Sequence, residues 1–159
     1  MSINAVDLLE QVITPTLITL GMHSPAAEKL LLGTAAQESG FDPFSQNHNG
    51  IGIYQISSQQ HRQAWDGYLA FRPDLASQVR GLASQRQFLN NPDQELKTNL
   101  AYSTAIAWII YLQTEHQLPA ADDVDGLCNV WQSTFSQQSE TAYCAEQFAQ
   151  WLRSNPAAA

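Results

Sequence analysis

The stretch from Leu96 to Leu112 is the most apolar part of the chain and constrains the fold more than any other segment. It follows the helix-breaking pair Asn91-Pro92, and its large apolar residues occupy most of the circumference of a helix: Leu96, Leu100, Ile106, Ile109, Ile110 and Leu112. A helix that is apolar all round must be covered by other elements. We therefore expect it to be central and buried.

Start and stop signals elsewhere in the chain are also helical. Ser24 is a good N-cap, Pro25 suits the first helical position, and Gly40 ends the segment between them. The sequence predicts further helices over residues 6–13, stopped or kinked by Pro15; from Pro73, with Leu75, Val79, Leu82 and Leu89 on one stripe; from Val124 to Phe135; and around Cys144, Phe148, Trp151 and Leu152.

Residues 41–58 have a different composition. Pro43, Gly50 and Gly52 stand among β-branched residues, which favours a small hairpin or an extended loop over a helix. We predict a mainly α fold with a small β-hairpin or loop insertion near residues 41–58. All of residues 1–159 are assigned to one domain, with a frayed tail at 155–159.

The net charge of the chain argues against some classes of binding partner. Charged residues make up only 14% of the chain, and its formal net charge is −8 with a pI near 4.7. This balance argues against nucleic acid and against docking on an anionic membrane. No apolar run approaches the ~18 residues that span a bilayer, and no signal peptide is recognisable. We expect synthesis in the cytoplasm, with any work outside it requiring lysis, injection or a dedicated export route.

Glu38 is the candidate catalytic residue. It lies in the last turn of an apolar helix, where unpaired carbonyl groups and the helix macrodipole disfavour a negative charge. The neighbouring Phe41 adds apolar surroundings, so we expect the pKa of Glu38 to be raised. A carboxylic acid that stays protonated near neutral pH can protonate the leaving oxygen of a glycosidic bond. By position alone, a solvated glutamate at a helix end is the alternative.

Twelve residues later comes Gly50-Ile51-Gly52-Ile53-Tyr54-Gln55-Ile56. Its two glycines allow the backbone to approach a ligand closely. Tyr54 offers a stacking surface and Gln55 an amide that both donates and accepts hydrogen bonds. This combination suits a sugar, although such a tract alone often forms only a turn.

Together these tracts resemble the lytic transglycosylase family of the lysozyme-like clan. Its signature stands here as Glu38-Ser39, Asn49-Gly50 and Gly52-Ile53-Tyr54-Gln55-Ile56. Residues 61–73 (HRQAWDGYLAFRP) and 99–107 (NLAYSTAIA) are similar to a phage-type subgroup. The resemblance covers about residues 28–152, leaving residues 1–23 as an N-terminal helical extension.

The resemblance implies a lysozyme-like fold that cleaves the β-1,4 bond between N-acetylmuramic acid and N-acetylglucosamine in peptidoglycan. Glu38 would act as general acid and then as base, giving a 1,6-anhydro product without a second carboxylate. Residues expected to position or contact the glycan strand are Ser39, Gly52, Ile53, Tyr54, Gln55, Tyr102 and Phe135. No cofactor is implied, and partners in a virion or a secretion machine are compatible with the subgroup.

One departure leaves an alternative open. Family members carry a Trp-Lys-x-x-Tyr-Asn-like tract where this chain has Phe135 and Ser136, so a hydroxyl and an amide are lost. The alternative is therefore a catalytically weak or inactive module that binds murein or serves in a virion. A helical scaffold protein is a third possibility, and hydrolysis with Asp42 as a second acid is a variant of the first.

We expect no functional site at the histidines or the cysteines. The histidines at positions 23, 48, 61 and 116 show no metal-ligand spacing, so no metal site is expected. Cys128 and Cys144 lie on apolar helix faces and are expected to be buried free thiols, although their spacing does not exclude pairing.

Overall fold

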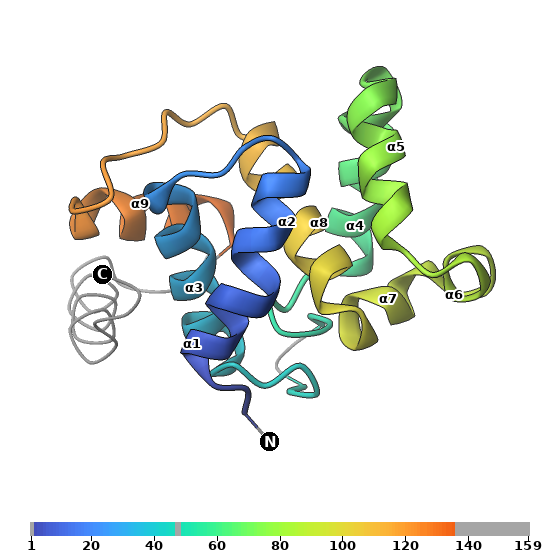
Figure 1. Cartoon of the computed structure of the whole chain (residues 1–159), viewed down its shortest axis with the longest axis horizontal. Coiled ribbons are helices and arrows are strands. Elements are labelled where there is room, and N and C mark those ends of the chain that lie inside the picture. The colour runs from blue at the N-terminus through green and yellow to red at the C-terminus, as the bar shows by residue number, and fades with distance from the viewer. Residues whose placement is uncertain (1, 47–48, 136–159) are drawn as a thin grey trace.

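The computed structural model describes residues 2–46 and 49–135. Within them the elements are helical, and in chain order they are α1 (Ala5–Leu8), the π-helical turn η1 (Leu9–Ile13), α2 (Thr14–Thr19), α3 (Pro25–Ser39), α4 (Ser58–Gly67), the 3₁₀ turn η2 (Leu69–Phe71), α5 (Pro73–Leu82), α6 (Gln85–Asn90), α7 (Pro92–Thr98), α8 (Leu100–Gln113) and α9 (Val124–Thr134). The mainly α class is thus confirmed (Figure 1). The helix expected around residues 144–152, and the tail beyond it, lie outside the described residues.

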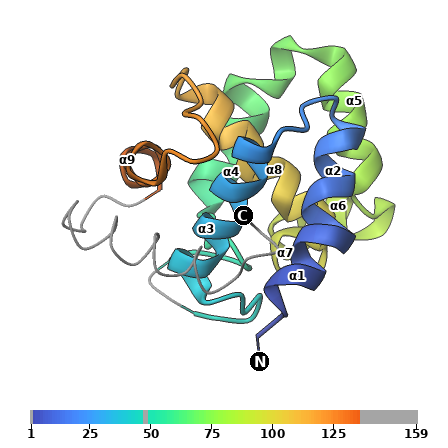
Figure 2. The same ribbon diagram turned by 60° about the vertical axis from the view of Figure 1, so that its left-hand side comes forward.

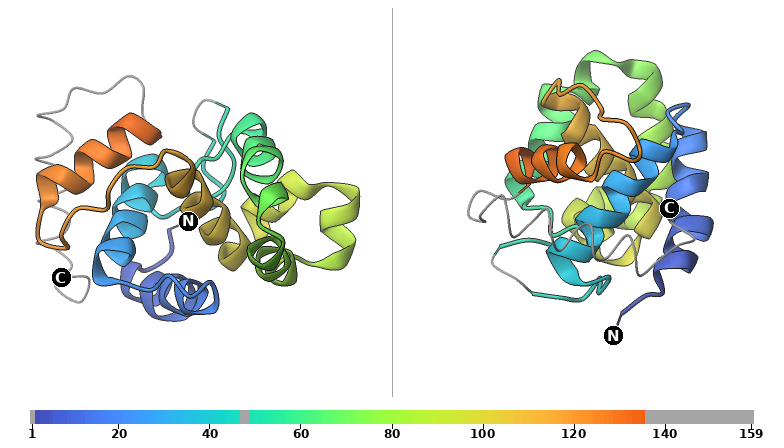
Figure 3. Two further views of the ribbon diagram at one scale, coloured as in Figure 1. Left: turned by 90° about the horizontal axis from the view of Figure 1, so that it is seen from above. Right: turned by 90° about the vertical axis from the view of Figure 1, so that its left-hand side faces the viewer.

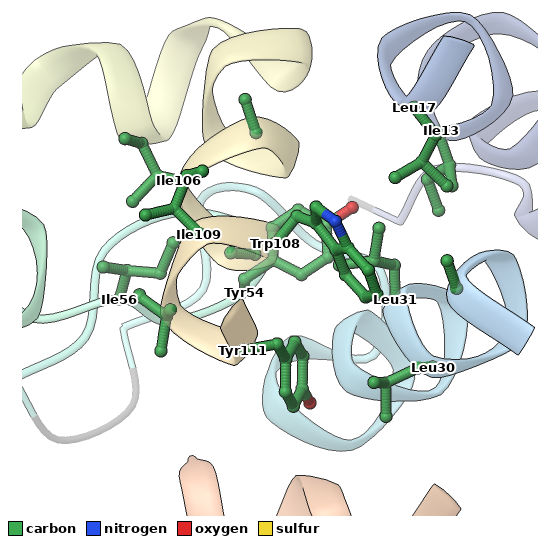
Figure 4. Close-up of a cluster of buried hydrophobic side chains, with 14 of the residues drawn as sticks. Ile13, Leu17, Leu30, Leu31, Tyr54, Ile56, Ile106, Trp108, Ile109 and Tyr111 are labelled. Carbon is green, nitrogen blue, oxygen red and sulfur yellow. The ribbon is translucent and has the colours of Figure 1, made fainter. Parts of the chain in front are cut away.

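Helix α8 is the centre of the molecule, as its all-round apolar sequence predicts. Every residue from Tyr102 to Tyr111 is buried, and α8 contacts α2, α3, α4, α5 and α7. Seen from above in Figure 3, α8 has α3 on one side and α4 and α5 on the other, and in the turned view of Figure 2 it lies between α3 and α2. Its isoleucines pack with side chains from α3, from the N-terminal helices and from the loop after α3 (Figure 4).

The N-terminal helical segment continues across Pro15 instead of ending there. A helix interior normally rejects proline because the residue lacks an N–H and its ring clashes with the carbonyl four residues earlier. Here η1 widens the helix before Pro15, with the N–H of Thr14 bonded to the carbonyl of Leu9. Leu8, Ile13 and Leu17 are all buried in the same core as α8, so residues 5–19 belong to the packed body.

Two longer helical segments are each divided in the structure. The stripe expected from Pro73 to Leu89 is interrupted because Ser84 caps a new helix, α6, and Leu89 is left 76% exposed. The apolar stretch beginning at Leu96 is likewise divided at Asn99. The Asn99 side chain accepts a hydrogen bond from the N–H of Tyr102 at 3.0 Å, which starts α8 afresh.

The loop after α3 contains one antiparallel bridge, between Ile51 and Ile56, and no strand is present among the described residues. Gly52 has a positive φ of 79°, and a Cβ built there would lie 1.9 Å from the carbonyl oxygen of Leu96. Only glycine satisfies both conditions, so the tight turn depends on it.

Helix α9 packs against α3 and carries Leu127, Cys128 and Trp131 into the core. Cys128 is disulfide-bonded, which corrects the expectation of a free thiol. The chain's other cysteine, Cys144, lies outside the described residues. In the part of the chain that the structure describes, none of the helices has both the length and the apolarity needed to cross a bilayer.

Replacing Gly52 with alanine tests the turn. We expect Gly52→Ala to lower the free energy of unfolding by more than about 2 kcal/mol, since the left-handed backbone and the overlap with Leu96 both oppose a Cβ. The matched control is Gly81→Ala in α5, where a Cβ meets nothing within 4 Å. The control should gain up to about 1 kcal/mol, because alanine is the better helix former. Urea unfolding measures both, and equal effects would contradict this account of the turn.

Candidate active site

Glu38 lies in the last turn of α3, at the place where the chain changes direction. Ser24 caps the start of this helix, accepting a hydrogen bond from the N–H of Ala27 at 3.1 Å. At its end, Gly40 and Phe41 both adopt left-handed backbone conformations, with φ of 61° and 66°. These two residues turn the chain away and leave the side chain of Glu38 half-buried.

Burial sets the proton affinity of Glu38. Removal from water raises its pKa from 4.5 to about 7, while an interaction with the Trp131 side chain opposes the rise. The indole N–H of Trp131 is itself buried and makes no hydrogen bond of good geometry within the described residues. The direction agrees with the sequence analysis, and the structure assigns the largest effect to burial. At neutral pH the carboxyl group is therefore close to half protonated.

Thr34 and Tyr111 lie next to Glu38. Thr34 is one turn earlier on α3, and its hydroxyl donates to the carbonyl of Leu30 at 2.6 Å. Because that hydroxyl has a single hydrogen, the Tyr111 hydroxyl, also 2.6 Å away, must donate to Thr34. The pKa of Tyr111 is well above its usual value, owing first to burial and further to the charge of Glu38. Tyr111 therefore stays neutral and is held by Thr34.

Phe135 follows α9 and joins this neighbourhood through Tyr111. The two ring centroids are 5.0 Å apart, and Phe135 is only partly buried. The structure thus brings together Glu38, Tyr111, Trp131 and Phe135 from α3, α8 and α9. Ser136, the other departure from the family pattern, lies outside the described residues.

Ser39 fastens the glycine loop to the end of α3. Its hydroxyl donates to the carbonyl of Ile53 at 2.6 Å and is 3.2 Å from the carbonyl of Ala35. It also accepts a hydrogen bond from the N–H of Asp42 at 3.3 Å. Ser39 therefore positions the loop beside Glu38.

The expected sugar-contacting side chains of the loop point into the protein. Ile53 and Tyr54 are fully buried, and the Tyr54 hydroxyl is 2.8 Å from that of Thr104. The amide nitrogen of Gln55 donates to the carbonyls of Ser45 and Gly52, each at 2.8 Å. In this structure these side chains support the loop instead of offering a surface to a ligand.

The backbone of the loop remains open on another side. Gly50, Ile51 and Gly52 border a cavity of about 450 Å³ whose other lining is mostly polar: Ser45, Gln46, Asn49, Asn91, Asp93, Gln94 and Lys97. Amides, a hydroxyl and backbone groups together suit a ligand rich in hydroxyl groups. Of the predicted loop residues, Gly52 is the one that borders this cavity.

Tyr102 belongs to a different cluster. It is fully buried on α8, where its hydroxyl lies 2.6 Å from Nε2 of His61 and accepts a hydrogen bond from the indole of Trp65 at 2.8 Å. The structure therefore separates Tyr102 from the surroundings of Glu38.

Three residues beside Glu38 were not predicted as site residues: Thr34, Tyr111 and Trp131. Thr34 could have been found from the sequence, since it stands four positions before Glu38 on the same helix. Tyr111 and Trp131 come from helices distant in the sequence and carry no local signal.

Asp42 and the histidines add no second acid or metal site within the described residues. The N–H of Phe44 donates to Asp42 at 3.0 Å, and this bond lowers the pKa of Asp42, as expected for a turn residue. No group of three or more His, Cys, Asp or Glu side chains suited to a metal ion occurs in the described ranges. His48 lies outside them.

Comparison with known proteins adds no relative. No protein family, no curated protein and no solved structure significantly matches the chain.

Changing Glu38 to glutamine should make stability less sensitive to pH. A folded-state pKa of about 7 against 4.5 means that the native state binds more protons between these values, so wild-type stability falls as pH rises through this window. Above pH 7 we expect Glu38→Gln to be more stable by roughly 1–2 kcal/mol, since water still reaches part of the side chain. Below pH 4.5 the difference should vanish.

Thermal unfolding from pH 4 to pH 8.5 measures this difference, with Glu10→Gln, at an exposed position of η1, as the matched control. A constant difference between Glu38→Gln and wild type at every pH would contradict the raised pKa.

Proposed function

We propose that this chain cleaves the glycan strand of peptidoglycan between N-acetylmuramic acid and N-acetylglucosamine, with Glu38 as general acid and then general base. The observation that carries the proposal is the half-buried carboxyl group at the end of α3, whose pKa is about 7. A glutamate with the usual pKa would be ionised at neutral pH and would have no proton to give.

The proposed reaction needs one carboxyl group. Protonated Glu38 gives its proton to the leaving glycosidic oxygen as the bond to C1 breaks. The resulting carboxylate is stabilised by the indole N–H of Trp131 and accepts a proton from the muramyl 6-hydroxyl as that oxygen attacks C1. A 1,6-anhydro ring forms, and Glu38 ends protonated, with no water consumed.

The contacts between the glycine-containing loop and α3 support the assignment of Glu38 as the catalytic residue. The bond from Ser39 to the Ile53 carbonyl holds the Gly52–Gln55 turn against the helix that carries Glu38. The polar cavity bordered by Gly50 and Gly52 offers amides to sugar hydroxyls. The same proposal includes a lysozyme-like fold, in which the loop closed by the bridge between Ile51 and Ile56 stands in place of a longer β-hairpin. It also includes delivery of the protein to the cell wall.

A second candidate function is a module that binds murein without cleaving it. It is favoured by Phe135, which places a ring against Tyr111 but supplies no hydroxyl, and by the burial of the Tyr54 and Gln55 side chains. A missing hydrogen bond of this kind changes a free energy by about 0.5–1.5 kcal/mol, or about two- to tenfold in rate, which slows a reaction without abolishing it. Cleavage therefore stays the first proposal.

Purified protein should clear a gel containing murein, and Glu38→Gln should abolish the clearing while the fold is retained. Glu10→Gln should clear as wild type does. Mass spectrometry of the products separates the mechanisms, because 1,6-anhydromuramyl ends require internal attack and reducing ends require water. Binding to murein with no cleavage by wild type, and none by Phe135→Tyr, would overturn the enzymatic proposal in favour of the binding module.

The pH profile should carry the signature of Glu38. Because the protonated form reacts, kcat/KM should fall tenfold per pH unit above about pH 7 and stay level below it. Trp131→Phe removes the indole N–H that favours the carboxylate, so its decline should begin at higher pH. Rates measured on soluble murein fragments from pH 5 to pH 9 test this, and an unmoved profile in Trp131→Phe would remove Trp131 from the proposed site.

A further inference from the structure

A second cavity, of about 270 Å³, is lined by residues of α4, α6 and α7. These helices lie on the side of α8 away from α3 (Figures 1 and 3). Three of its seven lining residues, His61, Arg62 and Trp65, come from the segment beginning at His61 that the proposed chemistry does not use; the others are Ser58, Phe88, Pro92 and Asp93. Its volume is just below the range of ordinary small-molecule sites, which limits it to a small ligand.

Behind this cavity, buried side chains form a network of hydrogen bonds that leads to Asp93. Asp93 Oδ1 is 2.8 Å from Nδ1 of His61, and the hydroxyl of Ser58 donates to Oδ2 at 2.6 Å. Burial alone would raise the pKa of Asp93, but these two bonds and the nearby charges of His61 and Arg62 outweigh it and lower the pKa. Asp93 is therefore a fixed, ionised carboxylate.

This network of hydrogen bonds fixes the position of Asp93. An ionised Asp93 only accepts, so the Nδ1 of His61 carries a hydrogen and donates it. On the other side of the ring, Nε2 lies 2.6 Å from the hydroxyl of Tyr102, whose oxygen accepts from the indole of Trp65 at 2.8 Å. Asp93 is therefore held in one orientation by buried side chains.

Asp93 keeps acceptor capacity toward the cavity. Its side chain is 37% exposed, while that of His61 behind it is only 4% exposed. A carboxylate has about four acceptor positions, and the contacts with Ser58 and His61 occupy two of them. A donor entering the cavity can use the others.

Arg62 supplies the opposite charge. Its exposed guanidinium lines the same cavity and is near enough to lower the pKa of Asp93, yet the two form no ion pair in the described part of the chain. The other arginine nearby, Arg80, is already stacked on Phe88 at 4.1 Å. The same cavity also has an apolar wall, in which the rings of Trp65 and Phe88 meet edge to face with centroids 5.5 Å apart.

We propose that this cavity binds an α-amino acid, with its ammonium group on Asp93, its carboxylate on Arg62 and its apolar side chain against Trp65 and Phe88. A simple cation would leave Arg62 unpaired, and a simple anion would face the carboxylate of Asp93. A zwitterion with a short apolar body matches both charges and the aromatic wall. This site does not involve Glu38, although Asp93 also borders the polar cavity beside Gly50 and Gly52.

Titration of the full chain with L-leucine tests the proposal, with the NMR resonance of the Trp65 indole N–H as the readout. We expect a saturable shift, and binding weakened at least about tenfold in Arg62→Gln and in Asp93→Asn. Arg86→Gln on exposed α6, outside the cavity lining, is the matched control and should bind as wild type does.

Two leucine derivatives test each charge without altering the protein. Leucinamide lacks the carboxylate and N-acetylleucine lacks the ammonium group, so both should bind at least about tenfold more weakly than leucine. If Asp93→Asn unfolds, Arg62→Gln and these derivatives decide the result. No saturable shift up to about 10 mM leucine, or equal binding of leucinamide, would overturn the proposal.

Discussion

The burial of α8 is the constraint on which the rest of the structure depends. A helix without a polar face cannot lie at the surface, so neighbouring helices must surround it. Their packing fixes the ends of those helices, and both clusters of interest arise there. One forms where α3 and α9 meet α8 around Glu38, and the other where α4 and α7 meet it around Asp93. The same helix thus supplies Tyr111 to the first and Tyr102 to the second.

These two clusters treat a carboxyl group in opposite ways. Glu38 is covered and receives little compensation beyond Trp131, so its neutral form is favoured. Asp93 is covered less and accepts hydrogen bonds from Ser58 and His61, so its charge is favoured. The contrast separates a group suited to giving a proton from one suited to holding a cationic group. It also explains why ionisation of Glu38 lowers the free energy of unfolding as the pH rises toward 7 and above.

The sequence predicts well what depends on local signals. Ser24 and Gly40 bound α3 as expected, and the helix from Val124 is found. It predicts poorly what depends on tertiary contact. Pro15 is accommodated in a continuous helical segment because the π-helical turn η1 widens the helix before it. The side chains of Tyr54 and Gln55 point inward because they form hydrogen bonds with the Thr104 hydroxyl and the Ser45 carbonyl, respectively. Glu38 was identified from its helix end, whereas Tyr111 and Trp131 required the fold.

The proposed catalysis depends on the proton affinity of the Glu38 side chain, and that property can be measured directly. With carbon-13 in the glutamate side chains, the NMR titration of the Glu38 carboxyl, assigned by its absence in Glu38→Gln, gives its pKa in the intact protein. We predict a midpoint near 7. A midpoint near 4.5, the value of an ordinary exposed glutamate, would contradict the assignment of Glu38 as the general acid.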